Sequence, residues 1–229
     1  MKKKSETLFN GKDLSGWQVK CLTKDRDKEF WKVNDSVIEC NSLGKPDHDY
    51  VWLQSEKEFD NFQLQLKFQV FHSSKGNSGV QFRSRYDQSV SAPKGGWLNG
   101  PQVDIHPATP LRTGLIYDET HGVNRWICPS LKNSAMVVSK APKGAHVTKL
   151  VYADNDLHAW NTLKLVCDGM KIQTWVNNNK VCDFDGTGLL DDQKHKTCNV
   201  GIKGHIALQL HNRDELLIRY KDIIVTPIQ

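Results

Sequence analysis

The sequence predicts an all-β protein, a jelly-roll sandwich of two antiparallel sheets. Residues 62–70 alternate apolar and polar side chains without a break, and a period of two is that of a strand with one buried face. Turns rich in Asn and Gly separate further short runs of the same period. No window of the chain carries a convincing helical period. Because strand signals continue from end to end, we expect one domain over residues 1–229.

Two β-hairpins are the clearest elements beside this strand. The first joins residues 31–33 to 37–40 through Asn-Asp-Ser, and the second joins residues 172–176 to 181–184 through Asn-Asn-Asn. Asn and Asp tolerate the left-handed backbone that tight hairpins require. Weaker runs of period two predict further strands at residues 80–84, 162–167, 206–211 and 216–225, and long loops are expected at residues 85–99 and 122–149.

Composition excludes several classes of protein. Only 38% of the 229 residues are hydrophobic, but seven Trp, eight Phe and five Tyr are enough to fill a core, so a disordered chain is not expected. No stretch approaches the roughly 20 consecutive apolar residues of a membrane helix. The net charge of +5 comes from interleaved charges, whereas a nucleic-acid surface usually gathers its basic residues in one stripe. We therefore expect neither a membrane span nor a nucleic-acid partner.

The cysteines and the N-terminus leave the compartment open. The six cysteines contain no C-x-x-C pair, which argues against a zinc knuckle. Their even number permits disulfides, but scattered buried thiols are the simpler interpretation in a chain of this length. The chain opens with Met and three Lys, and no apolar run follows them. We expect a periplasmic or secreted protein if an upstream signal peptide has been removed, and a cytoplasmic one otherwise.

The most informative stretch is residues 100–106, GPQVDIH. As a strand it directs Gln102, Asp104 and His106 to one face and its apolar side chains to the other. Alternate polar side chains are costly on a packed face and suit the floor of a wet cleft. An ordinary solvent-facing strand would show the same pattern.

Two other strand-like runs favour the cleft. They present planar amides, guanidinium groups and an imidazole at alternate positions, a mixture that suits sugar hydroxyls because each hydroxyl both donates and accepts. These residues are Gln81, Arg83 and Arg85 in one run and Gln209 and His211 in the other. Aromatic side chains can stack on the apolar face of a sugar ring, although packing in a core is their commoner role. The candidates are Trp97, Tyr117 and Trp126.

Several segments also follow one another in a recognisable order. They begin at residues 8–17 (LFNGKDLSGW) and end at residues 219–225 (RYKDIIV). Between these lie residues 31–33 with 37–39, 62–68, 77–85, 100–105, 113–119, 160–165 and 204–211. Together they resemble the 3-keto-disaccharide hydrolase domain family over nearly the whole chain. The resemblance implies a concanavalin A-like jelly roll with a concave carbohydrate-binding face, action on glycosides that include 3-keto-glycosides, and commonly an exported location.

The polar strand is also similar to the Glu-x-Asp-x-Glu strand of laminarinase-type jelly-roll glycosidases. The equivalent positions here are Gln102, Asp104 and His106. The usual carboxylate pair is therefore absent from this strand, and a standard retaining mechanism is not expected.

The 3-keto group that the resemblance implies suggests another route, because a ketone at C3 acidifies the C2 proton. A base can remove that proton, the aglycone can leave from C1 by elimination, and water can add back. We expect Asp104 or His211 as the base, Glu119 or Tyr117 as the acid, and Arg83 as the donor that stabilises the enolate. The expected substrate contacts are Gln81, Arg85, Gln102, His106, Tyr117, Gln209 and Trp97.

Other functions stay open from the sequence. A non-catalytic carbohydrate-binding module would use the same side chains, and a structural or partner-binding sandwich is a third reading. Asp104, His106 and His211 suit a divalent metal, but they lack H-x-H or H-x-x-x-H spacing, so neither a metal nor a cofactor is predicted. A structural Ca²⁺ is a weaker alternative, without EF-hand spacing. Its candidate ligands are Asp154, Asp156, Asp185, Asp191 and Asp192.

Overall fold

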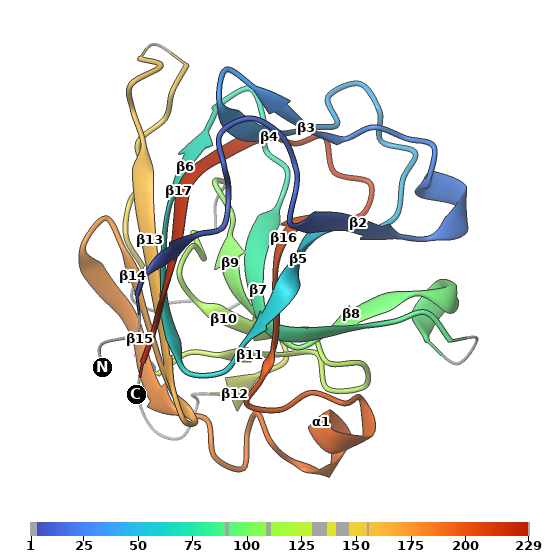
Figure 1. The fold of residues 1–229 in the computed structure, drawn as a ribbon, viewed down its shortest axis with the longest axis vertical. Helices are drawn as coiled ribbons and strands as arrows, with labels where there is room; N and C mark the ends of the chain where they lie inside the picture. The colour runs from blue at the N-terminus through green and yellow to red at the C-terminus, as the bar shows by residue number, and fades with distance from the viewer. Residues whose placement is uncertain are drawn as a thin grey trace.

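The computed structural model describes residues 4–89, 92–108, 111–129, 137–140, 147–154 and 156–228. In these ranges the chain forms two antiparallel β-sheets packed face to face, here called sheet 1 and sheet 2 (Figure 1). The helical content of the described residues is one short helix, α1 (Gln193–Thr197), and two 3₁₀ turns, η1 (Thr23–Asp25) and η2 (Pro93–Gly95). The predicted all-β jelly-roll sandwich is confirmed.

Both sheets draw their strands from distant parts of the chain. Among the described residues sheet 1 has eight strands, in the order β15 (Asn179–Asp185), β14 (Lys171–Val176), β13 (Asn161–Asp168), β6 (Phe62–Val70), β17 (Leu217–Pro227), β4 (Val37–Asn41) and β3 (Trp31–Asn34), with β1 (Glu6–Thr7) on β17. Sheet 2 has nine described strands, in the order β12 (Val137–Val138), β11 (Arg125–Ile127), β10 (Ile116–Asp118), β9 (Pro101–Ile105), β7 (Ser78–Asp87), β16 (Gly204–Leu210), β5 (Val51–Phe59) and β2 (Trp17–Cys21), with β8 (Trp97–Asn99) on β7.

The two predicted hairpins are present, with the backbone that their turn residues allow. Strands β3 and β4 join through Asp35 and Ser36, whose φ angles are 49° and 59°. Strands β14 and β15 join through Asn177 and Asn178, at φ 48° and 66°. These are left-handed conformations, which Asn and Asp adopt at lower cost than most residues.

The inner faces of the two sheets form one large apolar core. The alternation of β6 is realised, because Phe62, Leu64 and Phe68 are buried while Gln65 is exposed. A hydroxyl contact joins the sheets inside this core, where Tyr220 Oη lies 2.7 Å from Ser78 Oγ. Burial of apolar side chains on both inner faces is the main stabilising term of such a sandwich.

The cysteines follow the simpler sequence interpretation. All six are free thiols, and Cys40, Cys128, Cys167 and Cys182 are buried. Burial raises the pKa of Cys167 and that of Cys182 to about 12, because a thiolate is poorly solvated in an apolar interior. These thiols act as small apolar core residues.

The prediction of two long loops was wrong in part. Residues 85–87 continue β7, which pairs with β8, and β11 and β12 extend sheet 2. Such short edge strands gain their hydrogen bonds from a neighbour and need no alternating pattern of their own. Residues 130–136 and 141–146 of the second predicted loop lie outside the described residues.

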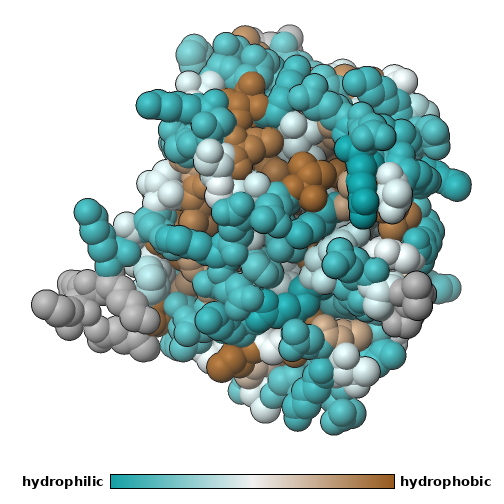
Figure 2. Space-filling model, turned by 45° about the vertical axis from the view of Figure 1, so that its right-hand side comes forward, coloured by the Kyte–Doolittle hydropathy of each residue, from teal (hydrophilic) through white to brown (hydrophobic). Residues whose placement is uncertain are grey.

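The surface is mainly hydrophilic on the face drawn in Figure 2, where apolar side chains gather in the upper half. Within the described ranges, no helix has the length and apolarity needed to cross a membrane.

Candidate active site

A polar pocket of about 230 Å³ lies on the outer face of sheet 2, where β9, β10 and β11 present their outward side chains. We call it the sheet 2 pocket. It combines acidic, basic, amide and aromatic groups: Tyr50, Asn77, Trp97, Gln102, Asp104, Arg112, Tyr117, Glu119, Asn124, Trp126 and His211. The polar strand of residues 100–106 is therefore part of a cleft floor, as predicted from its alternation.

Two buried carboxyl groups face this pocket. Asp104 lies on β9 and is 1% exposed, and Glu119 follows β10 and is 5% exposed. Burial raises the pKa of Asp104 to about 6, against the opposing charge of Arg112, whose Nε is 3.3 Å from Asp104 Oδ2. Burial raises the pKa of Glu119 to about 7, and the negative charge of Asp104 adds to this rise. The two groups thus titrate near neutrality as a coupled pair.

Strand β9 carries one carboxyl group of the pocket, Asp104, and no second one, as its sequence indicated. The second carboxyl comes from the residue after the neighbouring strand, where the Glu119 N–H donates to the Gly100 carbonyl at 3.1 Å. Gln209 of β16 lies below, and its Nε2 is 3.3 Å from Glu119 Oε1. Alternation along one strand does not reveal a partner that arrives from the next strand.

A chain of hydrogen-bonding groups forms a second part of the pocket. Tyr50 Oη lies 3.0 Å from His211 Nε2, and His211 Nδ1 lies 3.4 Å from Asp214 Oδ2. Burial opposes the charged imidazole, but Asp214 and the pocket carboxylates outweigh it and raise the pKa of His211. The Asn77 N–H donates to Asp214 Oδ2 at 2.7 Å and fixes that carboxylate. The chain favours a positively charged His211 beside the pocket.

Aromatic side chains form the walls. Tyr117 and Trp126 on the paired strands β10 and β11 have ring centroids 4.8 Å apart, and the Arg112 guanidinium lies 5.2 Å from the centre of the Trp126 ring. Tyr50 meets Trp97 edge to face at 5.1 Å. These walls offer flat apolar surfaces above a polar floor, an arrangement suited to a ring with one apolar face.

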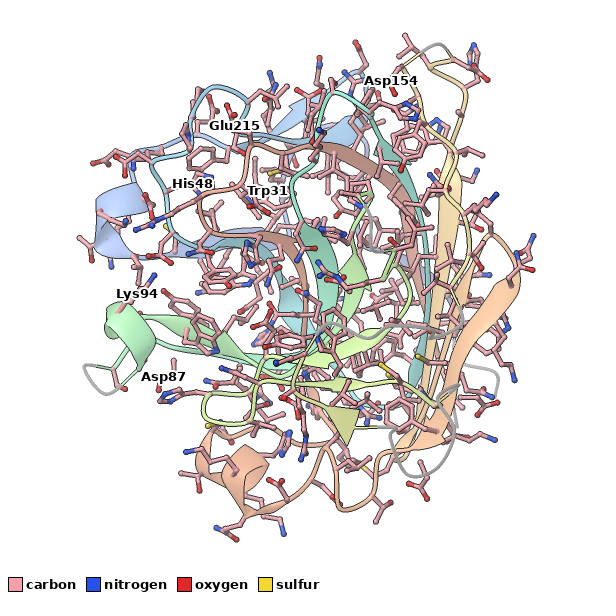
Figure 3. All side chains as sticks on the ribbon, turned by 180° about the vertical axis from the view of Figure 1, so that it is seen from behind. Trp31, His48, Asp87, Lys94, Asp154 and Glu215 are labelled. Atoms are coloured by element: carbon pink, nitrogen blue, oxygen red, sulfur yellow. The ribbon has the colours of Figure 1, made fainter. Side chains whose placement is uncertain are left out.

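Two segments are tied together beside the pocket. Lys94 lies at the end of the arm formed by β7 and β8 and is labelled in Figure 3. It forms an ion pair at 2.7 Å with Asp49, the residue that precedes Tyr50. The neighbouring His48, also labelled in Figure 3, places Nε2 3.0 Å from the Asp214 carbonyl. The ion pair and this imidazole contact thus anchor the segment that carries Tyr50 and the turn that carries Asp214.

The pocket floor has room for the Gln102 side chain because residue 79 is a glycine. Gly79 of β7 lies next to Gln102 of β9, and a Cβ at Gly79 would be 2.2 Å from Gln102 Cδ. The glycine leaves space for the Gln102 amide, whose Oε1 is buried without a hydrogen-bond partner in the described structure. An unpaired buried amide oxygen is a candidate contact for a ligand hydroxyl.

The structure does not bring Arg83 to the pocket, so its predicted role as the enolate-stabilising donor has to be corrected. Arg83 has φ 51° and sits where the pairing of β7 with β16 shifts register. Such a bulge breaks the alternation on which the prediction relied. Its guanidinium is buried elsewhere and donates to the Asp60 carbonyl at 2.8 Å and the Gly169 carbonyl at 2.7 Å. Arg112 is the arginine that reaches the pocket.

Four predicted substrate contacts also lie outside the pocket lining. Arg85 forms an ion pair with Glu58. His106 is held at the end of β9 by Thr113 and Ala108. Gln81 donates to the Leu98 carbonyl at 3.0 Å, and Gln209 reaches the pocket only through Glu119. Seven predicted residues do line the pocket: Asp104, Glu119, His211, Gln102, Tyr117, Trp97 and Trp126.

The sequence interpretation missed other residues of the site. Tyr50, Asn77 and Asn124 line the pocket and Asp214 supports His211. Two weak signals were available, since Asp214 stands three residues after His211 and Asn77 opens one of the family-like segments. Nothing in the local pattern distinguishes Tyr50 or Asn124 from ordinary loop residues.

Metal ligands are a separate question. Within the described ranges no group of three or more His, Cys, Asp and Glu side chains is arranged to hold a metal ion. The loop carboxylates considered for Ca²⁺ accept backbone N–H groups of turns or of the α1 N-terminus, as Asp185, Asp191 and Asp192 do. These carboxylates are used as turn and helix caps.

The fold and the pocket define a jelly-roll protein with a carboxyl-containing cleft on one sheet. The chain belongs to the 3-keto-α-glucoside-1,2-lyase-like domain family, whose model matches residues 4–226. No curated protein sequence is significantly similar to it.

Solved structures with the same fold are distant in sequence. A candidate glycosyl hydrolase from Parabacteroides distasonis ATCC 8503 has 17% identity and a TM-score of 0.59, with 98% of this chain and 94% of that chain covered. The carbohydrate-binding module CBM66 from Bacillus subtilis has 12% identity and a TM-score of 0.57, with 92% and 95% covered. A Bacillus licheniformis β-glucanase has 8% identity and a TM-score of 0.52, with 100% and 99% covered. At these identities the likeness is one of fold.

Proposed function

We propose that this protein cleaves glycosides whose sugar carries a ketone at C3, by elimination across C1 and C2 followed by addition of water. The observation that carries the proposal is the coupled carboxyl pair of Asp104 and Glu119, with pKa values of about 6 and about 7, in one pocket with Arg112. Membership in a lyase-like family supports the same reaction.

The chemistry requires one base, one acid and one enolate-stabilising group. The base takes the C2 proton, and the electron pair of that C–H bond passes into the enolate of the C3 ketone. When the C1–O bond breaks, the enolate electrons form the C1=C2 double bond, the C3 carbonyl is restored, and the acid protonates the departing oxygen. Water then adds its oxygen to C1 and a proton to C2, which gives the free 3-keto sugar.

The environments of the two carboxyls suggest their roles. Asp104 is mostly ionised at pH 7, with the Arg112 cation beside it, and is assigned as the base. Glu119 has the higher pKa and keeps a proton on a larger fraction of molecules, which suits the acid. Burial raises the pKa of Tyr117 to about 12, so Glu119 is the better matched donor.

Arg112 and His211 supply positive charge. Arg112 takes the role predicted for Arg83, because its guanidinium lies in the pocket, beside Asp104 and over the Trp126 ring. His211 is held towards its charged form by Asp214, which makes it a poorer base than Asp104 and a suitable donor to a developing oxyanion. Preorganised donors of this kind act where charge develops in the transition state.

Kinetics with a 3-keto-α-glucoside in D₂O test the proposal. Elimination and hydration place solvent deuterium at C2 of the released sugar, whereas direct hydrolysis leaves the C2 hydrogen in place. We expect Asp104→Asn to lower kcat by about 10²- to 10⁴-fold with the fold intact. Asp183→Asn, which alters a carboxylate on β15 in the other sheet, should retain activity. Wild-type turnover in Asp104→Asn, or release of sugar without deuterium at C2, would overturn the proposal.

A non-catalytic carbohydrate-binding module is the second candidate. The aromatic walls formed by Trp97, Tyr117 and Trp126, together with the Gln102 amide, are the features that favour it. In that case the wild-type protein would bind the 3-keto-glycoside in calorimetry and would release no aglycone.

A further inference from the structure

A second, larger groove lies on the outer face of sheet 1. Its volume is about 430 Å³, and strands β6, β13, β14 and β17 provide its walls. We call it the sheet 1 groove. The two sheets pack face to face (Figure 1), with the core between their inner faces. The groove lies on the outer face of sheet 1 and the pocket on the outer face of sheet 2, so the two sites open on opposite sides of the sandwich. A ligand in one site therefore does not contact the other.

The strand register places five outward side chains in one row, and four of them line the groove: Trp175, Lys164, Gln65 and Ile224. Lys180 lies opposite Trp175, Trp175 opposite Lys164, Lys164 opposite Gln65, and Gln65 opposite Ile224. With a strand spacing of about 4.8 Å the row extends roughly 19 Å. The row thus runs ammonium, partly exposed indole, ammonium, amide and aliphatic side chain, along a line long enough for several sugar rings.

The positive charge of this face is only partly neutralised. Lys67 pairs with Asp222 at 2.9 Å, and Lys180 pairs with Asp183 at 2.7 Å. Lys164 instead lies 3.7 Å from the centre of the Trp175 ring. Within the described part of the chain, no carboxylate forms an ion pair with it. An ammonium over a partly exposed indole keeps N–H groups free for an anion from solvent.

A second lysine repeats this arrangement. Lys221 lies 4.0 Å from the centre of the Trp160 ring. It stands beside the groove lining, where it pairs with the lining residue Lys67, two positions along β6 from Gln65 and two strands from Lys164. Strand spacing and rise place the two Cα atoms about 12 Å apart. At this separation the two lysines match anionic groups on different residues of one chain better than two oxygens of a single group.

We propose that the sheet 1 groove binds an acidic oligosaccharide. Its carboxylate or sulfate groups contact Lys164 and Lys221, its rings lie along Trp175 and Ile224, and its hydroxyls bond with the Gln65 amide. Planar amides and an aromatic face suit sugar rings, and the two lysines select those that carry negative charge. The groove would hold the protein on an acidic polysaccharide whatever reaction the sheet 2 pocket performs.

Calorimetry with the full chain tests this proposal. The probes are tetragalacturonate, a sulfated tetrasaccharide and neutral maltotetraose. We expect at least one acidic probe to bind more tightly than maltotetraose, with an affinity that falls as salt is added. The acidic probe that binds identifies carboxylate or sulfate as the preferred anion.

Substitutions in the groove test whether the oligosaccharide binds there. Lys164→Gln should weaken binding two- to fivefold, as expected for loss of one exposed ion pair, and Trp175→Ala should weaken it about tenfold or more. Lys171→Gln removes the same charge from the same face of β14 beyond the groove and should leave binding unchanged. If Trp175→Ala does not fold, Lys164→Gln still decides. Equal binding of all three probes, unchanged binding in both groove variants, or a dimer that Trp175→Ala dissociates would overturn the proposal.

Discussion

Replacing His195 of helix α1 should destabilise the protein at neutral pH. The side chain is fully buried, with Nε2 3.0 Å from Asp118 Oδ2 and Nδ1 2.8 Å from Asp192 Oδ1. Ionised carboxylates only accept hydrogen bonds, so the imidazole must carry both protons to serve both partners. This cation links the helix to Asp118, which lies between the pocket residues Tyr117 and Glu119.

The size of the effect follows from what each carboxylate retains in His195→Ala. Removing one partner of a buried ion pair costs about 3–5 kcal/mol. Asp118 keeps Arg125 at 3.5 Å and the Thr120 N–H at 3.2 Å, and Asp192 is 34% exposed and regains water. We therefore expect the lower end, about 3 kcal/mol, which lowers Tm by roughly 6–12 °C in a chain of this length.

The loss should depend on pH with a definite sign. Burial is the largest single influence on His195 and lowers its pKa, but Asp118 and Asp192 together outweigh it and raise the pKa above the ordinary value. The stabilisation is then fully present below the unfolded pKa of about 6.5 and is lost as pH rises through the higher folded value. The difference between wild type and variant should be large at pH 6 and smaller at pH 9.

Urea unfolding at a series of pH values measures this difference. His158→Ala, which alters an exposed histidine, is the matched control and should change the free energy of unfolding by less than about 0.5 kcal/mol. A loss below about 1 kcal/mol for His195→Ala at pH 6 would refute the assignment, because a buried ion pair costs several times more to break. A difference that grows with pH would refute it as well.

Three further predictions concern the sheet 2 pocket and its surroundings. Turnover should rise through about pH 6 as Asp104 loses its proton and fall above about pH 7 as Glu119 loses its own; a rate that still increases at pH 9 contradicts these roles. Arg83→Ala should cost about 2–3 kcal/mol in urea unfolding, because it removes the charged hydrogen bonds that a buried guanidinium donates to the Asp60 and Gly169 carbonyls, while kcat of the folded protein stays near wild type; loss of kcat alone would restore the catalytic role. Gly79→Ala should raise KM several-fold, because the new Cβ would lie 2.2 Å from Gln102 Cδ and displace that amide; an unchanged KM in steady-state kinetics would exclude Gln102 as a substrate contact.

Local sequence patterns predicted much of the fold. Residues 62–70 form strand β6 because their apolar side chains recur with the period of a half-buried strand. The Asn-rich turn before β15 and the Asp-Ser turn before β4 adopt the left-handed backbone that their residues allow. The same patterns failed at Arg83, because a bulge in the pairing of β7 with β16 is decided by a distant partner strand.

The candidate site was predictable where it lies on a regular strand or directly beside one. Gln102 and Asp104 could be assigned from the alternation of β9, and both line the pocket. Tyr50 and Arg112 come from connecting segments, whose side chains follow no period. Their positions depend on contacts such as the pair of Arg112 with Asp104 and that of Tyr50 with His211.

The sequence by itself determined a β-sandwich of alternating strands, a polar strand suited to a cleft floor, and the order of segments that marks the family. Only the tertiary structure decided which polar groups share that cleft. Alternation is a property of neighbouring residues, whereas the meeting of Asp104 with Glu119, and of His211 with Tyr50, requires closure of long loops around a common core. The raised pKa values of Asp104 and Glu119 come from the same closure, because burial removes water from carboxyl groups that would titrate normally in an open chain.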